Sequence, residues 1–421
     1  MTSVLAPQLK LRIRSKLLEH KFGFILALLL VTFLSFPASS ISAQPSSPCT
    51  KYPGNPILTP GSQGAWDTGA VGEEFVSYNG TYYNMWYSTT STQLAIGFAS
   101  SRDGVHWTKY GSPVLTAGPK RSWDQGGVEA PTVVWNGTLF LMYFVGSNGI
   151  VASDIGVAFS KDMIHWREYA QNPVLTRGPA GSYDSFFVTY PDVIYDPPTY
   201  KMWYTARAGA GLVNGTYYTI AYATSLDGLH WTKYPGNPVV TPDTSSRYGF
   251  YTGAKYPNVL KLGGAYLMLL LFTDGADTIS YATSFDGIRW NSTGTPLITN
   301  TNNTLDWDNV PFYPSAIVNG TTLLLWYSGR TGTGFSPPPS IGLASCAVVL
   351  MPSTTTVTKT ITSMSTTTAT VTVISQTAIV QTMTTTEEIQ TPVSLAYQAS
   401  TVVLAIILGA IAAVLFAKRR R

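Results

Sequence analysis

Ser225-Leu-Asp-Gly-Leu-His-Trp231 is the clearest copy of a motif that occurs four times in this 421-residue chain. The other copies are Ser101-Arg-Asp-Gly-Val-His-Trp107, Ser160-Lys-Asp-Met-Ile-His-Trp166 and Ser284-Phe-Asp-Gly-Ile-Arg-Trp290. Their tryptophans are 59, 65 and 59 residues apart. A period of about 60 residues is too long for a helical solenoid repeat and is typical of one four-stranded β-propeller blade.

Each unit also opens with an X-Pro pair, and there are five of these: Asn55-Pro, Ser112-Pro, Asn172-Pro, Asn237-Pro and Thr295-Pro. Apolar runs rich in Val, Tyr, Phe and Trp follow, and such runs predict antiparallel strands. In the second unit they are Thr132–Trp135, Leu139–Val145 and Ile155–Phe159. Asn-Gly pairs between the first two runs suit type I′ hairpins. The pattern predicts an all-β, five-bladed β-propeller whose outer strands carry the tryptophans, with a β-sandwich as the alternative fold.

The two ends of the repeat region complement each other. Pro48-Cys49-Thr-Lys-Tyr-Pro-Gly-Asn-Pro56 resembles the segment from His230 to Pro238, which starts an outer strand. Ile341-Gly-Leu-Ala-Ser-Cys346 resembles Ile96–Ser101, which ends a third strand. We therefore expect residues 49–346 to form the propeller, with the N-terminal segment as the outer strand of the fifth blade. The only two cysteines, Cys49 and Cys346, are predicted to form a disulfide that closes the ring; two free thiols are the alternative.

The flanking segments predict a surface location. Residues 1–43 have the basic, apolar and small-residue regions of a signal peptide, or of an uncleaved anchor. In residues 351–392, 17 of 42 residues are Thr, which predicts an unfolded, O-glycosylated stalk, or a β-aggregating segment. Residues 395–417 predict a C-terminal transmembrane helix, and residues 418–421 a basic cytoplasmic tail. The propeller would then lie outside the cell.

Charge and motifs exclude several functions. The net charge of +4 comes largely from the termini, so no nucleic-acid partner is expected. No metal or cofactor motif is present, and none is predicted. The repeated His106, His165 and His230 are interpreted as structural, with the nearby Asp residues holding turn amides. Six Asn-x-Ser/Thr sites fit N-glycosylation or plain turns: Asn79, Asn136, Asn214, Asn291, Asn302 and Asn319.

The entries to the first strands differ between units, and strand direction places all five at the mouth of one funnel. They are Val71-Gly-Glu-Glu74, Val128-Glu-Ala-Pro131, Val188-Thr-Tyr-Pro-Asp192, Ala254-Lys-Tyr-Pro257 and Pro311-Phe-Tyr-Pro314. A structural role would repeat, but the charged residues here do not. Paired carboxylates in an aromatic-lined pocket are what glycoside hydrolysis requires.

At these residues the chain resembles the five-bladed propeller glycosidases of glycoside hydrolase families 43, 32 and 68 and the β-mannoside phosphorylases of family 130. The Asn-Pro-Val-Leu openings, the repeated loops and Gly127-Val-Glu-Ala-Pro131 carry the resemblance. It implies the propeller fold and a carbohydrate partner. The phosphorylases carry Asp and Arg where Ala130 and Thr132 stand here, so we expect hydrolysis rather than phosphorolysis.

We therefore predict a cell-surface glycoside hydrolase-like protein acting on poly- or oligosaccharide. Glu129 and Glu73 are predicted to be the acid/base pair, with Asp192 tuning their pKa values or orienting substrate. Arg207, Lys255, Glu74 and Arg330 are predicted to bind substrate. The alternatives are a non-catalytic surface propeller that binds glycans or envelope proteins, and a purely structural envelope component.

Overall fold

The computed structural model describes residues 41–45, 48–90, 94–149, 153–209, 218–241, 253–273, 277–301, 303–332 and 338–352. The chain divides into two compact units, Met1–Met351 and Pro352–Arg421, and nearly all of the second lies outside the described residues. The predicted signal peptide up to residue 40, the stalk beyond residue 352, the membrane helix, the basic tail, Asn214 and Asn302 lie outside them too. Among the described residues, no helical segment has the length and apolar character that membrane crossing requires.

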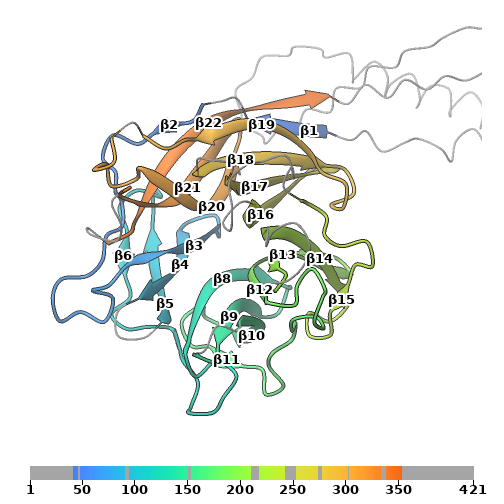
Figure 1. The fold of residues 1–421 in the computed structure, drawn as a ribbon. Helices are drawn as coiled ribbons and strands as arrows, with labels where there is room; N and C mark the ends of the chain where they lie inside the picture. Colours follow the sequence, from blue (N-terminus) through green and yellow to red (C-terminus); the bar gives the residue numbers. More distant parts are fainter. Residues whose placement is uncertain are drawn as a thin grey trace, which may run out of the picture. The chain divides into compact units, whose positions relative to one another are not determined.

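The described part of the chain is all-β, and its long strands form five antiparallel groups of three (Figure 1). Group one is β3 (Val71–Tyr78), β4 (Tyr83–Thr90) and β5 (Leu94–Ser101); group two is β8 (Gly127–Trp135), β9 (Phe140–Ser147) and β10 (Ser153–Ser160); group three is β12 (Phe187–Asp196), β13 (Thr199–Arg207) and β14 (Tyr218–Ser225); group four is β16 (Gly253–Leu262), β17 (Ala265–Thr273) and β18 (Asp277–Ser284); and group five is β20 (Val310–Asn319), β21 (Thr322–Arg330) and β22 (Ser340–Pro352).

An outer strand completes each group. These strands are β6 (Thr108–Lys109), β11 (Arg167–Glu168), β15 (Thr232–Lys233), β19 (Asn291–Ile298) and, for group five, β2 (Thr50–Lys51). The prediction that the repeated tryptophans lie on these strands is wrong, because each one immediately precedes its strand and hydrogen-bonds the turn. Two further short strands are β7 (Leu115–Thr116), which pairs with β5, and β1 (Ile41–Pro45), which lies next to β22 and begins inside the predicted signal peptide.

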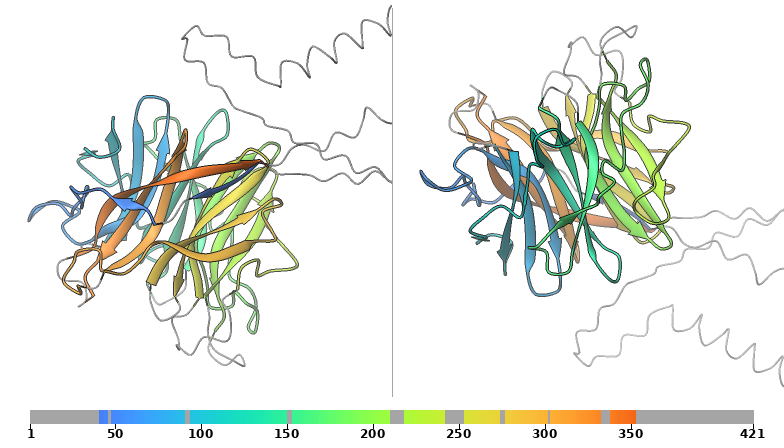
Figure 2. Two further views of the ribbon diagram at one scale, coloured as in Figure 1. Left: turned by 90° about the horizontal axis from the view of Figure 1, so that it is seen from above. Right: turned by 90° about the horizontal axis from the view of Figure 1, so that it is seen from below.

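The first strands of the groups form a closed circuit. In chain order β3 contacts β8, β8 contacts β12, β12 contacts β16, β16 contacts β20, and β20 contacts β3 (Figures 1 and 2). Between groups the backbone pairing is slight: Leu94 with Gly127 and Tyr218 with Gly253. Side-chain packing therefore joins the groups. This arrangement is propeller-like and does not correspond to the β-sandwich alternative.

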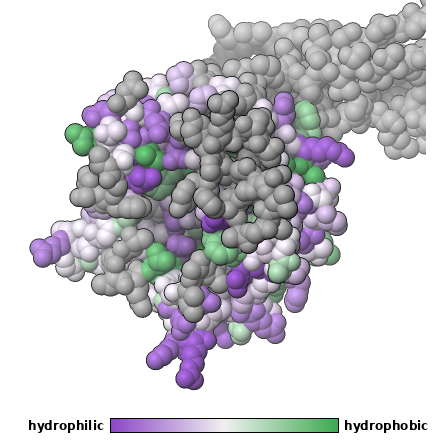
Figure 3. Space-filling view, viewed as in Figure 1, coloured by the Kyte–Doolittle hydropathy of each residue, from purple (hydrophilic) through white to green (hydrophobic). Residues whose placement is uncertain are grey.

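The hydrophobic core lies between neighbouring groups rather than at the centre of the ring. Each gap holds one cluster of buried side chains, and four of the gaps are centred on a large aromatic residue of a second strand: Trp86, Tyr143, Trp203 and Trp326. The gap between groups four and five has Leu269 at the equivalent position. On the face seen in Figure 3, by contrast, hydrophilic and pale residues predominate and hydrophobic ones are scattered.

The repeated Ser-x-Asp-Gly-x-x-Trp loop fastens neighbouring groups together. Within the first copy, the carboxylate of Asp103 accepts hydrogen bonds from two turn amides and lies 2.7 Å from the exposed ring of His106, which confirms the structural interpretation. The carbonyl oxygen of Gly104 accepts one indole N–H from Trp107 and another, at 2.9 Å, from Trp326 of group five. Met163, Gly228 and Gly287 accept in the same way from groups one, two and three. The motif therefore joins neighbouring groups through a hydrogen bond to the loop carbonyl oxygen.

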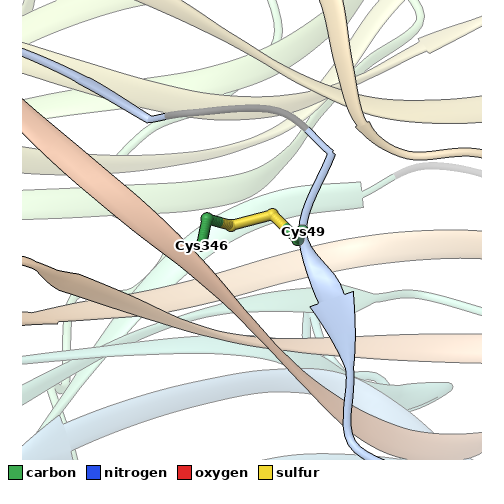
Figure 4. Close-up of a disulfide and its surroundings, with 2 residues drawn as sticks. All are labelled: Cys49 and Cys346. Atoms are coloured by element: carbon green, nitrogen blue, oxygen red, sulfur yellow. A yellow bond between two sulfur atoms is a disulfide. The ribbon is translucent and has the colours of Figure 1, made fainter.

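A disulfide takes the place of the missing fifth loop. Cys49, just before β2, is bonded to Cys346 on β22, with a Cα–Cα distance of 4.4 Å (Figure 4). β2 pairs antiparallel with β22 through Thr50 and Lys51. The predicted bond and the predicted N-terminal outer strand are both confirmed. The apolar Leu269 fits its position between groups four and five, because the disulfide supplies no loop carbonyl there for an indole to reach.

Buried aspartates before the first strands pair with lysines of the outer strands. Lys109 binds Asp67 at 2.6 Å, Lys51 binds Asp308 at 2.7 Å, and Lys233 binds Asp184 at 2.5 Å. In group two the lysine position holds Glu168, which therefore faces Asp124. Burial, and next the charge of Asp124, raise the pKa of Glu168 to about 7. Group two therefore has a repulsion between two carboxyl groups where groups one, three and five have an ion pair.

Replacing Glu168 by lysine should stabilise the protein by about 1 kcal/mol at pH 8, because the new side chain can form the charge-assisted bond found in three of the four other groups. A carboxyl pKa raised on folding contributes stability below its unfolded value, and that contribution is lost as the pH rises through about 7. Glu168→Lys should therefore flatten the fall in stability between about pH 5 and 8. Urea unfolding across this range measures both effects. Glu168→Gln is the matched control, and an equal gain in Glu168→Gln would show that the lysine forms no bond.

Candidate active site

A β-bulge interrupts the first strand of every group at the same place. The five bulges displace the pairing registers, and each contains one non-glycine residue with φ between 50° and 58°. These residues are Glu73, Ala130, Tyr190, Tyr256 and Tyr313, and we call them the bulge ring. Left-handed backbone at bulky residues costs of order 1–3 kcal/mol each and is concentrated at functional sites. The shared position confirms the alignment of the five strand entries.

Hydroxyl groups of neighbouring second strands hold the bulges in place. The N–H of Glu73 donates to Ser328 at 3.2 Å, and the N–H of Ala130 donates to Ser88 at 2.8 Å. The N–H of Tyr256 donates in the same way to Thr205 at 3.0 Å. Each bond joins a bulge to the preceding group, so the strained backbone is fixed by the assembled ring.

Three tyrosines fill one side of the bulge ring. The centroids of Tyr190, Tyr256 and Tyr313 lie 4.2–5.2 Å apart, and the hydroxyls of Tyr190 and Tyr313 are 2.9 Å apart. These tyrosines were not predicted to be site residues, although the repeated Tyr-Pro pairs of three strand entries were a signal for them. Glu73 and the small Ala130 occupy the other side of the ring.

Two cavities meet at Glu73. One, with about 350 Å³ of empty space, is lined by the bulge ring and the residues that follow it. The other, with about 450 Å³, is lined by residues that precede the bulges of groups one and five, together with Glu73, Ser88 and Tyr313. Glu73 therefore borders both cavities.

Glu73 is surrounded by hydrogen-bond donors. Its Oε2 accepts from the backbone N–H of Ala130 at 3.1 Å, and its Oε1 accepts from the hydroxyl of Tyr190 at 3.3 Å. Burial raises its pKa, while bonds from Ser88, Tyr313, Ala130 and Tyr190 act to lower it. These donors favour the ionised carboxylate.

Glu129 directly precedes the bulge residue Ala130. Burial, and next the charge of Glu73, raise the pKa of Glu129 well above its usual value. No Lys or Arg forms a salt bridge with Glu129 within the described ranges. The structure therefore brings the two predicted acid/base residues together in different environments.

The Glu74 carboxyl group contacts group five. The hydroxyl of Ser328 donates to its Oε2 at 2.7 Å, and its buried Oε1 has no hydrogen-bond partner among the described residues. Burial raises the pKa of Glu74 to about 8, so this carboxyl is mostly protonated at neutral pH. Its one bonded contact links two groups, although the residue also lines the first cavity.

Asp192 bridges neighbouring first strands. Its Oδ2 accepts the N–H of Val259 in the next group at 2.7 Å. Asn258 and Ser315, at the equivalent positions, accept N–H groups of the groups that follow them. Asp192 also faces Thr132, whose hydroxyl lies 3.4 Å away, and burial raises its pKa to about 7. The side chain at this position differs between groups, but its hydrogen bond to the next first strand recurs. This recurrence favours a structural role for Asp192.

The predicted basic residues divide into two sites. Arg207 and Lys255 lie together around the ring of Tyr218 on groups three and four. Arg330, at the end of β21, donates to the carbonyl oxygen of Thr331. Within the described ranges, no three His, Cys, Asp or Glu side chains are grouped closely enough to hold a metal ion.

The described sequons occupy turns and strand ends. Asn79 and Asn136 accept turn amides through their side-chain oxygens, as plain Asn-Gly turns do. Asn291 begins β19 and Asn319 ends β20. Their glycosylation remains a prediction.

Comparison with known proteins gives the chain a family. No protein-family model matches it. Uncharacterized protein Rv1502 of Mycobacterium tuberculosis (strain H37Rv) is 32% identical over 236 residues, which cover 53% of this chain and 75% of that protein. The chain belongs to the family of Rv1502. β-1,2-Mannobiose phosphorylase of Thermoanaerobacter sp. (strain X514) is 26% identical over 136 residues, covering 28% of this chain and 44% of the phosphorylase.

Solved structures confirm the resemblance at the level of the fold. One belongs to the GH130 family of mannoside phosphorylases, which contains glycoside hydrolases that target β-1,2-mannosidic linkages in Candida mannan. It has a TM-score of 0.54 at 13% identity and covers 74% of this chain and 95% of its own. A thermostable family-43 glycoside hydrolase has a TM-score of 0.52 at 18% identity, covering 68% and 91%. The neighbours of this Rv1502-family chain are therefore propeller-type glycosidases.

Proposed function

We propose that this protein is a five-bladed propeller that hydrolyses glycosidic bonds of a poly- or oligosaccharide at the cell surface. The observation that carries the proposal is the pairing of Glu73 with Glu129: burial raises the pKa of both carboxyl groups, and hydrogen-bond donors oppose that rise only at Glu73. Glycosidases need one protonated and one ionised carboxyl group beside the scissile bond. The glycosidase folds of the structural neighbours support the same chemistry.

The environments assign the roles. Burial, and next the charge of Glu73, raise the pKa of Glu129 well above its usual value, which suits Glu129 to act as the general acid. Glu73 accepts hydrogen bonds from Ala130 and Tyr190, which favour its ionised form and suit it to act as the second carboxylate. Glu129 would protonate the leaving oxygen, while Glu73 would activate water or attack the sugar. The roles follow from the general rule that different environments separate the pKa values of the acid and the base.

The residues around the pair support hydrolysis over phosphorolysis. Ala130 and Thr132 stand where the phosphorylases carry an acid and an arginine, and the hydroxyl of Thr132 faces Asp192 instead. Group one has glycine at the position equivalent to Glu129, and a Cβ on Gly72 would lie 2.7 Å from the Ser328 oxygen. Gly72 thus leaves the room that the Ser328 hydroxyl occupies.

A second candidate is glycan binding without catalysis. The packed tyrosines offer an aromatic platform of the kind that sugars contact with their C–H faces, and Ala130 removes a carboxyl group that the phosphorylases use. The apolar segment at residues 395–417 and the Thr-rich segment before it support a surface-anchored arrangement in either case.

A hydrolysis screen of the full-length protein, with and without phosphate, tests the proposal. We expect phosphate-independent release of reducing ends from at least one oligosaccharide, and a loss of at least about 100-fold in Glu129→Gln. Unchanged release in Glu129→Gln would remove Glu129 as the acid. Binding without release in the wild type would favour the second candidate, and release only in the presence of phosphate would contradict hydrolysis.

A further inference from the structure

Arg207 and Lys255 form a cluster of two cations held by aromatic rings. The guanidinium of Arg207 lies 5.1–5.5 Å from the ring centroids of Phe186, Phe187 and Tyr218. The ammonium of Lys255 lies 4.6 Å from the centroid of Tyr218. Aromatic faces stabilise cations in partly dehydrated sites without neutralising them.

Neither cation is neutralised within the described ranges. Every other half-buried lysine with a described ion pair binds an aspartate at 2.8 Å or less: Lys51, Lys109, Lys201 and Lys233. Lys255 is 7% exposed and has no salt bridge there. Burial lowers the pKa of Lys255, and Asp277 opposes this only as a nearby charge. The Nε of Arg207 is buried without a hydrogen-bond partner among the described residues. A buried lysine beside a half-buried arginine, with no acceptor between them, is costly unless an anion completes the site.

The Arg207–Lys255 cluster and the Glu73–Glu129 pair lie at the same ends of the first strands. Lys255 precedes the bulge residue Tyr256, as Glu129 precedes Ala130, so the two occupy equivalent positions of the ring. Arg207 pairs with Phe187, at the start of β12, and so approaches the same ends of the first strands. The cations stand on groups three and four, and the carboxyl groups on groups one and two.

We propose that Arg207 and Lys255 bind the carboxylate of an acidic sugar unit, so that the substrate is a uronic acid-containing glycan. This inference rests on the proposed function for the carbohydrate nature of the ligand. A guanidinium group offers parallel N–H donors, which match a planar carboxylate, and the ammonium group adds a third donor. Inorganic phosphate shares this oxyanion chemistry and is the competing occupant.

Binding of matched ligands to the full-length protein tests the proposal. The probes are oligosaccharides of glucuronic, galacturonic and mannuronic acid, each beside its methyl ester, which removes the charge and keeps the linkage. We expect one acid to bind about 10- to 100-fold more tightly than its ester by calorimetry. Lys255→Met and Arg207→Met should each lose most of that preference. Lys261→Met is the control, because Lys261 lies on the same strand but pairs with Asp196.

The outcomes are separable from those of the hydrolysis screen. Equal affinity for acids and esters, or a preference retained in both Met variants, would overturn the acidic-sugar site. Binding of inorganic phosphate alone, lost in the same variants, would assign the cluster to phosphate instead and also overturn it. Titrations of Glu129→Gln report the acid preference in the absence of cleavage, so a failed hydrolysis screen leaves this test decisive.

Discussion

Replacing Glu73 by glutamine is expected to lower the rate of glycosidic cleavage by about 1,000-fold and, at the same time, to lower the pKa of Glu129. The rate falls because the amide can neither activate water nor attack the sugar. The pKa of Glu129 falls because the charge of Glu73 is the second cause of its rise. Burial, the first cause, remains, so the pKa of Glu129 stays above its usual value.

The two effects need different measurements. The pH dependence of kcat/KM reports the pair, whose titrations are coupled, while carbon-13 spectra of the Glu129 carboxyl group follow one site directly. The limb of the rate profile that reports loss of the proton from Glu129 should move to lower pH in Glu73→Gln. Glu168→Gln, the same chemical change away from the ring, serves as the control. An unmoved Glu129 titration would mean that the carboxyl groups do not interact.

Removing the Cys49–Cys346 disulfide is expected to lower the free energy of unfolding by up to about 5 kcal/mol, because the bond joins residues 297 positions apart. The remaining contacts of the N-terminal segment reduce this loss. Asn55 exchanges two side-chain hydrogen bonds with the backbone of Leu343, and Lys51 binds the buried Asp308. We therefore expect the native ring to form in Cys49→Ser/Cys346→Ser but to unfold at lower denaturant concentration.

Urea unfolding with and without reductant separates the bond from the substitutions. Reductant should destabilise the wild type to the level of the double variant and leave the double variant unchanged. If reductant has no effect on wild-type stability, the cross-link contributes nothing to closure. A loss in the double variant that exceeds the reductant effect would point to packing, because the side chain of Cys346 is buried.

Much of the fold could be predicted from the sequence. The loop motif is local: Ser101 and Asp103 bond amides two or three residues away, so each copy shows the same pattern wherever it occurs. The pairing of the two ends of the repeat region also followed from comparing repeats. The first strands were predicted too short, since β8 begins at Gly127 and continues through the bulge.

The candidate site could be predicted only in part. Glu73 and Glu129 were found because they depart from the repeat. Asp192 also departs from the repeat, but it accepts the backbone N–H of Val259 in the next group. Asn258 and Ser315 accept the equivalent N–H groups in the groups that follow them, although their side chains differ. Residue type was therefore a poor guide to role at that position.

The sequence by itself determined the strands, the repeated turns, the closing disulfide and the position at which charged residues enter the ring, because these follow from local hydrogen bonds and from a regular repeat. Only the tertiary structure decided which side chains meet. The contact between Glu73 and Ala130, the tyrosine cluster and the shared ring of Arg207 and Lys255 join residues from different groups. Such contacts depend on the bulges and on ring closure, which bring distant parts of the chain to one mouth.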